Sequence, residues 1–250
     1  MKCLNSRMSA VGIIAAGLIS MGLTAPSVHA DGSVSGVVKF DGKMLAAKKI
    51  RVKGDAFCVK AHAEAPLLRE TYLFNEDKGT LINAIVYVSG GLGDKEFKAP
   101  DTELEVDQQG CQYIPHVNAV MTGQKVKIKN TDDTAHNLNL KAEKNPSFNE
   151  GQPVKGMIKE VAFPNPELAI PLKCDVHSWM SAWIAVFDNP FHAVTDENGE
   201  FTISGLPAGT YQLSVWHEFD KFVPAEKTIE ITVKDGETAS GEFTFAPPGK

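Results

Sequence analysis

Short segments of alternating apolar and polar residues recur along the chain and predict β-strands. The segments are rich in Val, Ile, Phe and Thr and are bounded by turn formers such as Asp41-Gly42 and Asp235-Gly236. The predicted strands are residues 34–40, 81–88, 125–129, 183–187, 200–203, 210–216, 228–233 and 241–245. A helical pattern is confined to a short window near residues 61–69. Because many short strands with regular turns are typical of packed sheets, we expect an all-β fold built from β-sandwiches.

The composition fits a globular protein and argues against nucleic-acid binding. Of the 250 residues, 43% are hydrophobic and 22% are charged, which is normal for a chain with a packed core. The 25 basic and 31 acidic residues give a net charge of −6. No run of basic residues exceeds two, so the clustered positive charge of a nucleic-acid-binding protein is absent from the sequence.

The first thirty residues are expected to be a secretory signal peptide rather than part of the fold. Lys2 and Arg7 precede an uncharged apolar stretch over residues 11–24, and Val28-His29-Ala30 fits a small-x-small cleavage site. The apolar stretch is short for a membrane span. We therefore expect cleavage near Ala30, a periplasmic or secreted location, and no transmembrane segment in the mature chain.

Export changes how the four cysteines are interpreted. Removal of the signal peptide takes away Cys3 and leaves Cys58, Cys111 and Cys174. In an oxidising compartment two of these three are expected to pair, leaving one free thiol.

A group of metal-ligand residues recurs at close spacing in the second half of the chain. Cys174, His177 and Met180 form the pattern C-x2-H-x2-M, and His136 follows a predicted strand 38 residues before the cysteine. One thiolate, two imidazoles and a weak axial thioether suit a copper ion that cycles between Cu(I) and Cu(II). A zinc site is the alternative, but no second Cys/His pair with zinc spacing follows. Met180 or His136 taken singly could also be an ordinary core residue.

Two segments around these residues resemble the cupredoxin family of type 1, or blue, copper proteins. They are GCQYIPHVNAVMTGQKVKIKNTDDTAHNLNL (residues 110–140) and VAFPNPELAIPLKCDVHSWMSAWIAVF (residues 161–187). The likeness spans about residues 103–188 and is greatest to the amicyanin/plastocyanin group, whose members also carry C-x2-H-x2-M. It implies a cupredoxin Greek-key sandwich that binds one type 1 copper ion. The implied copper ligands are His136, Cys174, His177 and Met180.

The same resemblance implies roles for residues next to the ligands. The backbone N–H of Asn137 would donate a hydrogen bond to the cysteine sulfur. The second histidine would keep an edge near solvent where partners dock, which makes His177 and Trp179 the candidate docking residues. Trp179 could instead be a buried support for the loop. The chain departs from the family pattern at Asp175-Val176 and at Ser178.

The remaining cysteines and the C-terminal region complete the predicted organisation. Cys58 and Cys111 lack metal-type neighbours at ligand spacing, and we assign them to a disulfide. Residues 194–216, VTDENGEFTISGLPAGTYQLSVW, resemble the carboxypeptidase regulatory-like family, a small prealbumin-like β-sandwich. The opening G-x-V-x-G-x-V of that family occurs far upstream at residues 32–38, so the copper domain could be inserted into a split sandwich, with residues 84–88 as a partner strand.

The predicted divisions are a signal peptide (1–30), an N-terminal β region (31–100), a copper domain (101–190) and a regulatory-like sandwich (191–250). Neither the His-x-His pairs of multicopper oxidases nor a second cysteine in the ligand loop occurs in the sequence. We therefore expect a non-enzymatic protein that transfers single electrons between periplasmic redox proteins, such as a dehydrogenase or a cytochrome. The alternatives are a copper protein for storage, delivery or sensing, and a cell-envelope scaffold or carbohydrate-binding module.

Overall fold

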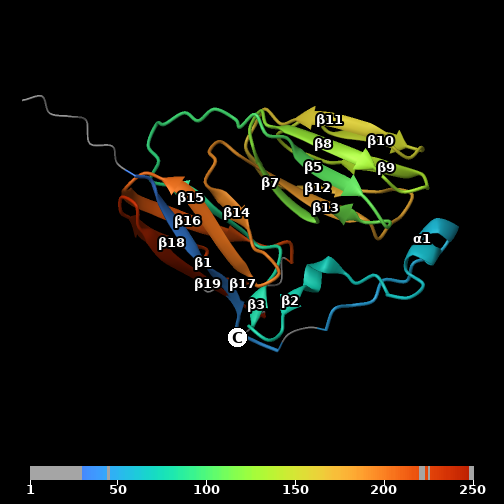
Figure 1. The fold of residues 1–250 in the computed structure, drawn as a ribbon, viewed down its shortest axis with the longest axis horizontal. Coiled ribbons are helices and arrows are strands. Elements are labelled where there is room, and N and C mark those ends of the chain that lie inside the picture. Colours follow the sequence, from blue (N-terminus) through green and yellow to red (C-terminus); the bar gives the residue numbers. More distant parts are fainter. Residues whose placement is uncertain (1–29, 44–45, 220–222, 225, 248–250) are drawn as a thin grey trace, which may run out of the picture.

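The computed structural model of the chain describes residues 30–43, 46–219, 223–224 and 226–247. Within these residues the fold is all-β, as predicted, and consists of two β-sandwiches that lie side by side (Figure 1). The expected signal peptide lies outside the described residues apart from Ala30. In the described part, no helix has the length and apolar character needed to cross a membrane.

The middle of the chain forms one sandwich, here called the central sandwich. One sheet has the order β10 (Phe148–Gln152), β9 (His136–Leu140), β12 (Glu167–Lys173), β13 (Ser181–Phe187) and β7 (Val117–Met121). The other has the order β11 (Ile158–Ala162), β8 (Lys125–Asn130), β5 (Leu104–Gln108) and β6 (Tyr113–Ile114). Alternate residues of both sheets point inward, for example Val126 and Ile128 of β8 against Leu138 and Leu140 of β9. This alternation closes a continuous core between the sheets.

The two ends of the described chain form the second sandwich, here called the terminal sandwich. One sheet has the order β17 (Val223–Pro224), β19 (Thr238–Ala246), β1 (Gly32–Phe40), β3 (Thr80–Leu81) and β2 (Phe74–Asn75), with β15 (Glu200–Leu206) also paired to β1. The opposite sheet has the order β14 (His192–Val194), β4 (Ile85–Gly90), β16 (Gly209–Trp216) and β18 (Thr228–Val233).

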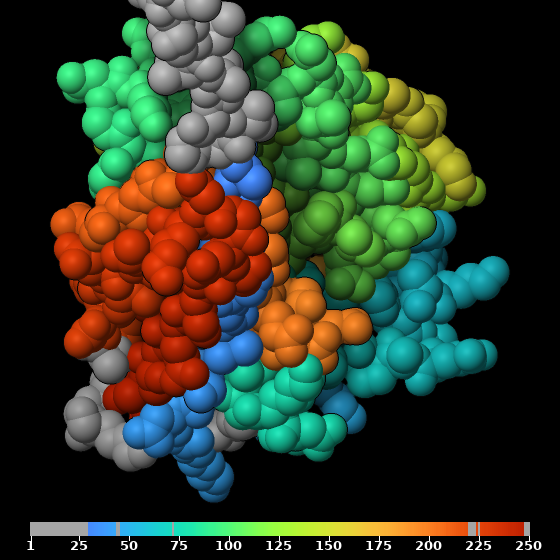
Figure 2. Space-filling model, turned by 60° about the vertical axis from the view of Figure 1, so that its left-hand side comes forward, coloured from blue at the N-terminus to red at the C-terminus, as the bar shows by residue number. Residues whose placement is uncertain are grey.

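The central sandwich is therefore inserted between β4 and β14 of the terminal sandwich. β1 lies between parallel β19 and antiparallel β15, and Figure 2 shows it as blue atoms between red and orange ones. The G-x-V-x-G-x-V pattern has a steric reason, because a Cβ at Gly36 would collide with the backbone carbonyl of Gly241. The prediction that residues 84–88 pair with the first strand is wrong, since β4 pairs with β14 and β16 in the opposite sheet.

Two local predictions also differ from the structure. The helix α1 (Ala56–Ala61) precedes the predicted window, because the Asp55 carboxylate caps it by accepting the Cys58 N–H at 2.9 Å. Residues 81–88 do not form one strand, since Asn83 has a φ of 65° and separates β3 from β4. The break lets the chain pass from one sheet of the terminal sandwich to the other.

Residues 48–69, here called the cover loop, belong to neither sandwich. Backbone hydrogen bonds from Ile50 to Leu67 and from Arg69 to Lys48, both 2.8 Å, close the base of the loop. Its tip carries α1, which lies at the end of the central sandwich (Figure 1). The predicted N-terminal β region therefore supplies both the strands β1–β4 and a separate covering segment.

The predicted disulfide between Cys58 and Cys111 is present and joins the tip of the cover loop to the central sandwich. Cys174 is free and buried. Labelling of thiols in metal-free protein that lacks residues 1–30, under denaturing and non-reducing conditions, is therefore expected to modify Cys174 alone. Modification of all three cysteines, or a cross-linked peptide that contains Cys174, would contradict this pairing.

A buried ionic cluster joins the two sandwiches. His116 of the central sandwich lies 2.6 Å from Glu218 through its Nε2 atom, and its Nδ1 atom lies 2.9 Å from the Ser181 carbonyl oxygen. The Trp183 indole N–H donates to the second oxygen of Glu218 at 2.9 Å. The side chains of His116 and Glu218 are 4% and 6% exposed, so this contact is shielded from water.

Candidate metal centre

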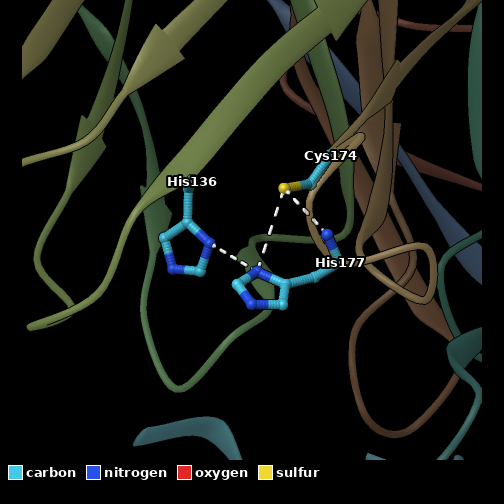
Figure 3. Close-up of side chains that lie close together, drawn as sticks. All are labelled: His136, Cys174 and His177. Atoms are coloured by element: carbon cyan, nitrogen blue, oxygen red, sulfur yellow. Dashed lines mark hydrogen bonds between the residues drawn. The ribbon is translucent and has the colours of Figure 1, made fainter. Parts of the chain in front are cut away.

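The predicted ligand residues are brought together by three adjacent strands of one sheet. His136 begins β9, Cys174 directly follows β12, and the loop from Cys174 to Met180 leads into β13. Because β9 and β12 are antiparallel, β9 begins at the end of the sheet where β12 ends, which places His136 beside Cys174 and His177, and Figure 3 shows these three side chains close together. Within the loop, the Met180 N–H donates to the His177 carbonyl at 2.9 Å, and the Cys174 N–H donates to the Met180 carbonyl at 3.2 Å. These two bonds fix the shape of the loop.

Three donor atoms converge on one point. The Nδ1 atoms of His136 and His177 are 3.1 Å apart, and the Cys174 sulfur lies 4.0 Å from the Nδ1 atom of His177 (Figure 3). The group of donor atoms from these three residues lies within 4.8 Å of one another. Each of the three residues is 2% exposed. Met180 is equally buried and packs in the same core cluster as Cys174.

Hydrogen bonds to the Cys174 sulfur favour its thiolate form. Burial raises its pKa, but hydrogen bonds from His136 and from the backbone N–H groups of His177 and Asn137 lower it by more. The pKa of Cys174 is therefore below its ordinary value. The His177 N–H lies 3.4 Å from the sulfur. The thiolate is the form of cysteine that binds metals. The bond from Asn137 is the one that the family resemblance implied.

Carboxylates lie on the outer side of both imidazoles. The Nε2 atom of His136 is 2.9 Å from Asp132, and the Nε2 atom of His177 is 3.5 Å from Asp55. Burial lowers the pKa of His136, but the bond to Asp132 and the nearby Cys174 raise it to about 9. The pKa of His177 is lowered by burial and by the charge of His136, despite the opposing charge of Asp55. Because the Nε2 atoms face carboxylates, the Nδ1 atoms face the sulfur.

The charged residue in the ligand loop points away from the donor atoms. The Asp175 carboxylate accepts hydrogen bonds from the side-chain amides of Asn139 and Asn149 at 2.8 and 2.9 Å. These two bonds lower its pKa. The Asp175 N–H also donates to the Asn137 side chain at 2.9 Å. Asp175 therefore ties the ligand loop to β9 and β10.

The structure differs from the expectation that His177 has an edge near solvent. The imidazole is covered by the tip of the cover loop, and its Nε2 atom is 3.5 Å from the sulfur of Cys58. Trp179 is half-buried, lies 5.0 Å from the His177 ring between centroids, and donates its indole N–H to the Cys111 carbonyl at 3.2 Å. These contacts match a supporting role for Trp179. In the ligand loop the exposed apolar side chain is Val176, at 57%.

Sequence reasoning missed the residues that surround the ligands from the outside. Asp132 lies four residues before His136, a spacing that could have indicated a contact. Asp55 has no such signal, because it is far from His177 in the sequence. His116 takes no part in the candidate centre, because it forms the buried inter-sandwich pair with Glu218. His62 lies outside the ligand group, and its Nε2 atom is 2.7 Å from the Gly110 carbonyl oxygen.

The C-terminal strands carry the hairpin predicted from the sequence. The turn at Asp196–Gly199 joins β14 to β15, and the Asp196 carboxylate accepts the N–H groups of Asn198 and Glu200 at 2.8 and 2.9 Å. Residues 182–249 match the carboxypeptidase regulatory-like domain. The match begins within β13 and includes β14–β19, so β1–β4 complete the sandwich of this regulatory-like domain from the other end of the chain.

Comparison with solved structures finds a copper-containing nitrite reductase, a purple cupredoxin and amicyanin. A copper-containing nitrite reductase from Thermus scotoductus SA-01 is 20% identical with a TM-score of 0.33, over 39% of this chain and 25% of that protein. A purple cupredoxin from Nitrosopumilus maritimus is 18% identical with a TM-score of 0.30, over 34% of this chain and 99% of its own length. An oxidised variant of amicyanin is 18% identical with a TM-score of 0.32, over 41% of this chain and 98% of its own. None of the curated proteins compared with the chain matches it.

Proposed function

We propose that the central sandwich binds one copper ion through His136, Cys174, His177 and Met180. The observation that carries this proposal is the convergence of two Nδ1 atoms and one sulfur within 4.8 Å in a buried position. Two imidazoles and a thiolate are the donor set of a type 1 copper site, and Met180 at the end of the same loop supplies the weak axial thioether. The hydrogen bonds that lower the pKa of Cys174 suit a sulfur that must act as a thiolate.

We further propose that the protein transfers single electrons and catalyses no reaction of its own. Two backbone hydrogen bonds within the ligand loop hold its shape, and the hydrogen bonds of Asp175 tie the loop to β9 and β10. A donor set held this firmly changes little between two oxidation states, which is the property that an electron carrier needs. Its partners would be redox proteins in the periplasm, reached after export directed by residues 1–30.

Burial of the ligands favours electron transfer over copper delivery. A protein that gives copper to another must expose its ligands for exchange, whereas His136, Cys174 and His177 are each 2% exposed. Cyclic voltammetry of the copper-loaded full chain tests this function. The expected result is a reversible one-electron wave with one copper per chain. Loss of copper on each reduction, or transfer of the metal to a weak chelator, would support delivery instead.

Replacing Met180 by Gln is expected to keep a coloured copper site and to lower its reduction potential. The amide oxygen is a harder ligand than the thioether and favours Cu(II). The potential is measured by redox titration of wild type and variant. Replacement of Met157, which is 38% exposed, by Gln is the control and should leave the potential unchanged. An unaltered potential in the Met180 variant would show that the thioether is not a copper ligand.

A further inference from the structure

The cover loop lies against the candidate metal centre at its outer side. Its residues Val52 and Phe57 pack against the core of the central sandwich, in addition to the disulfide between Cys58 and Cys111. Cys58 is completely buried, and its sulfur is 3.5 Å from the Nε2 atom of His177. The loop therefore occupies the position from which solvent or another protein would reach this imidazole.

Asp55 connects the cover loop to two parts of the centre. One carboxylate oxygen caps α1, and the other accepts the Thr134 hydroxyl at 2.7 Å and lies 3.5 Å from the Nε2 atom of His177. Thr134 belongs to the loop that precedes His136. The single carboxylate thus joins the cover, the His136 loop and the second imidazole.

Asp132 makes the equivalent contact on the other half of the disulfide. Its two oxygens accept the backbone N–H groups of Gly110 and Cys111 at 2.6 and 2.7 Å. One of these oxygens also lies 2.9 Å from the Nε2 atom of His136. Each half of the disulfide is thereby coupled to a carboxylate, and each carboxylate faces the outer nitrogen of one imidazole.

We propose that the disulfide-anchored cover loop is a working part of the metal centre: it seals His177 from solvent and from partner proteins, and Asp55 and Asp132 hold both imidazoles with Nδ1 toward Cys174. The two carboxylates are positioning residues, because they act through the imidazoles. Electron exchange then takes place at a surface other than His177. The proposal about solvent access stands without copper, whereas the role of the carboxylates toward the metal rests on the proposed function.

Chemical modification of histidines in the metal-free full chain tests the seal. Diethyl pyrocarbonate is added under native conditions, and the rate at His177 is followed by peptide mass spectrometry. In the Cys58→Ser/Cys111→Ser double variant, His177 is expected to react at least about tenfold faster than in wild type, because reaction of a covered group requires local opening. His217, buried in the terminal sandwich, is the internal control and should react at the same slow rate in both proteins.

A second variant guards against general unfolding. Asp55→Ala removes the helix cap and the contact with Thr134 but leaves the disulfide intact, and it should increase the rate at His177 while that at His217 stays slow. Equal rates at His177 in wild type and both variants would overturn the seal. If His177 is protected in wild type but copper does not bind, the seal stands and the proposed function fails. If copper binds but His177 reacts freely in wild type, the proposed function stands and the seal fails.

The positioning role is tested by the reduction potential of the copper-loaded protein. A carboxylate on the outer nitrogen makes an imidazole a stronger donor and stabilises Cu(II). Asp132→Asn is therefore expected to raise the potential. Asp133 is adjacent and exposed, so Asp133→Asn is the matched control and should leave the potential unchanged. Equal reduction potentials in the Asp132 and Asp133 variants would contradict the positioning role of Asp132.

Discussion

Replacing Cys174 by Ser is expected to abolish the visible colour of the Cu(II)-loaded protein. The thiolate is the donor responsible for an intense sulfur-to-copper band, and a serine hydroxyl is neither soft nor ionised at neutral pH. The absorption spectrum after addition of one equivalent of Cu(II) measures the effect. Cys174 is buried and its sulfur accepts several hydrogen bonds, and a serine hydroxyl can accept hydrogen bonds in the same place. Circular dichroism should therefore show that the variant retains its strands.

The matched control is the exposed loop residue Ser178, three positions before the next strand. Ser178→Ala changes the same loop without removing a donor atom, and it is expected to leave the band in place. A Cys174→Ser protein that keeps the band would show that the sulfur is not a ligand.

Replacing Glu218 by Ala is expected to destabilise the protein by roughly 3–5 kcal/mol, the usual cost of breaking a buried ion pair. His116 would remain buried without its 2.6 Å partner, and Trp183 would lose the acceptor of its indole N–H. The free energy of unfolding is measured by denaturant titration at pH 6. The control is Glu242→Ala, which removes an exposed ion pair with Lys39 and should cost less than about 1 kcal/mol.

The contribution of this pair should depend on pH in both directions. Glu70 also contacts His116, with its carboxylate 3.3 Å from the Nδ1 atom. Burial lowers the pKa of His116, but Glu218 and Glu70 raise it more, so its stabilisation is present below pH 6.5 and is lost as the pH rises through the raised value. Burial raises the pKa of Glu218, but His116 lowers it more, so its stabilisation is present above pH 4.5 and is lost at lower pH. The difference between wild type and the Glu218 variant should therefore be largest between about pH 4.5 and 6.5.

Local patterns were sufficient to predict part of the strands, and they singled out His136, Cys174 and His177, which the structure brings together. Alternation of apolar residues marks β8, β16 and β18, and the spacing of Cys174, His177 and Met180 reflects one tight loop between adjacent strands. The register that brings His136 beside this loop is set by pairing of β9 with β12. The same reasoning identified the disulfide, because Cys58 and Cys111 were the thiols left after Cys174 had been assigned to the metal.

Contacts between distant segments could not be predicted in this way. The cover loop has no periodic pattern, and nothing in the spacing of Asp55 and His177 indicates that they meet. The inter-sandwich pair of His116 and Glu218 depends on how two complete sandwiches pack together. The expectation from the family resemblance that His177 has an edge near solvent was wrong for the same reason. The cover loop, which covers His177, lies outside residues 103–188, the part of the chain that resembles the family.

The visible and paramagnetic-resonance spectra of the purified protein after addition of Cu(II) test the central proposal most directly. Coordination by Cys174, His136 and His177 predicts an intense thiolate-to-copper band and a narrow copper hyperfine splitting, at one copper per chain. A colourless Cu(II) adduct with wide hyperfine splitting, or preferential binding of Zn(II), would contradict a type 1 copper centre.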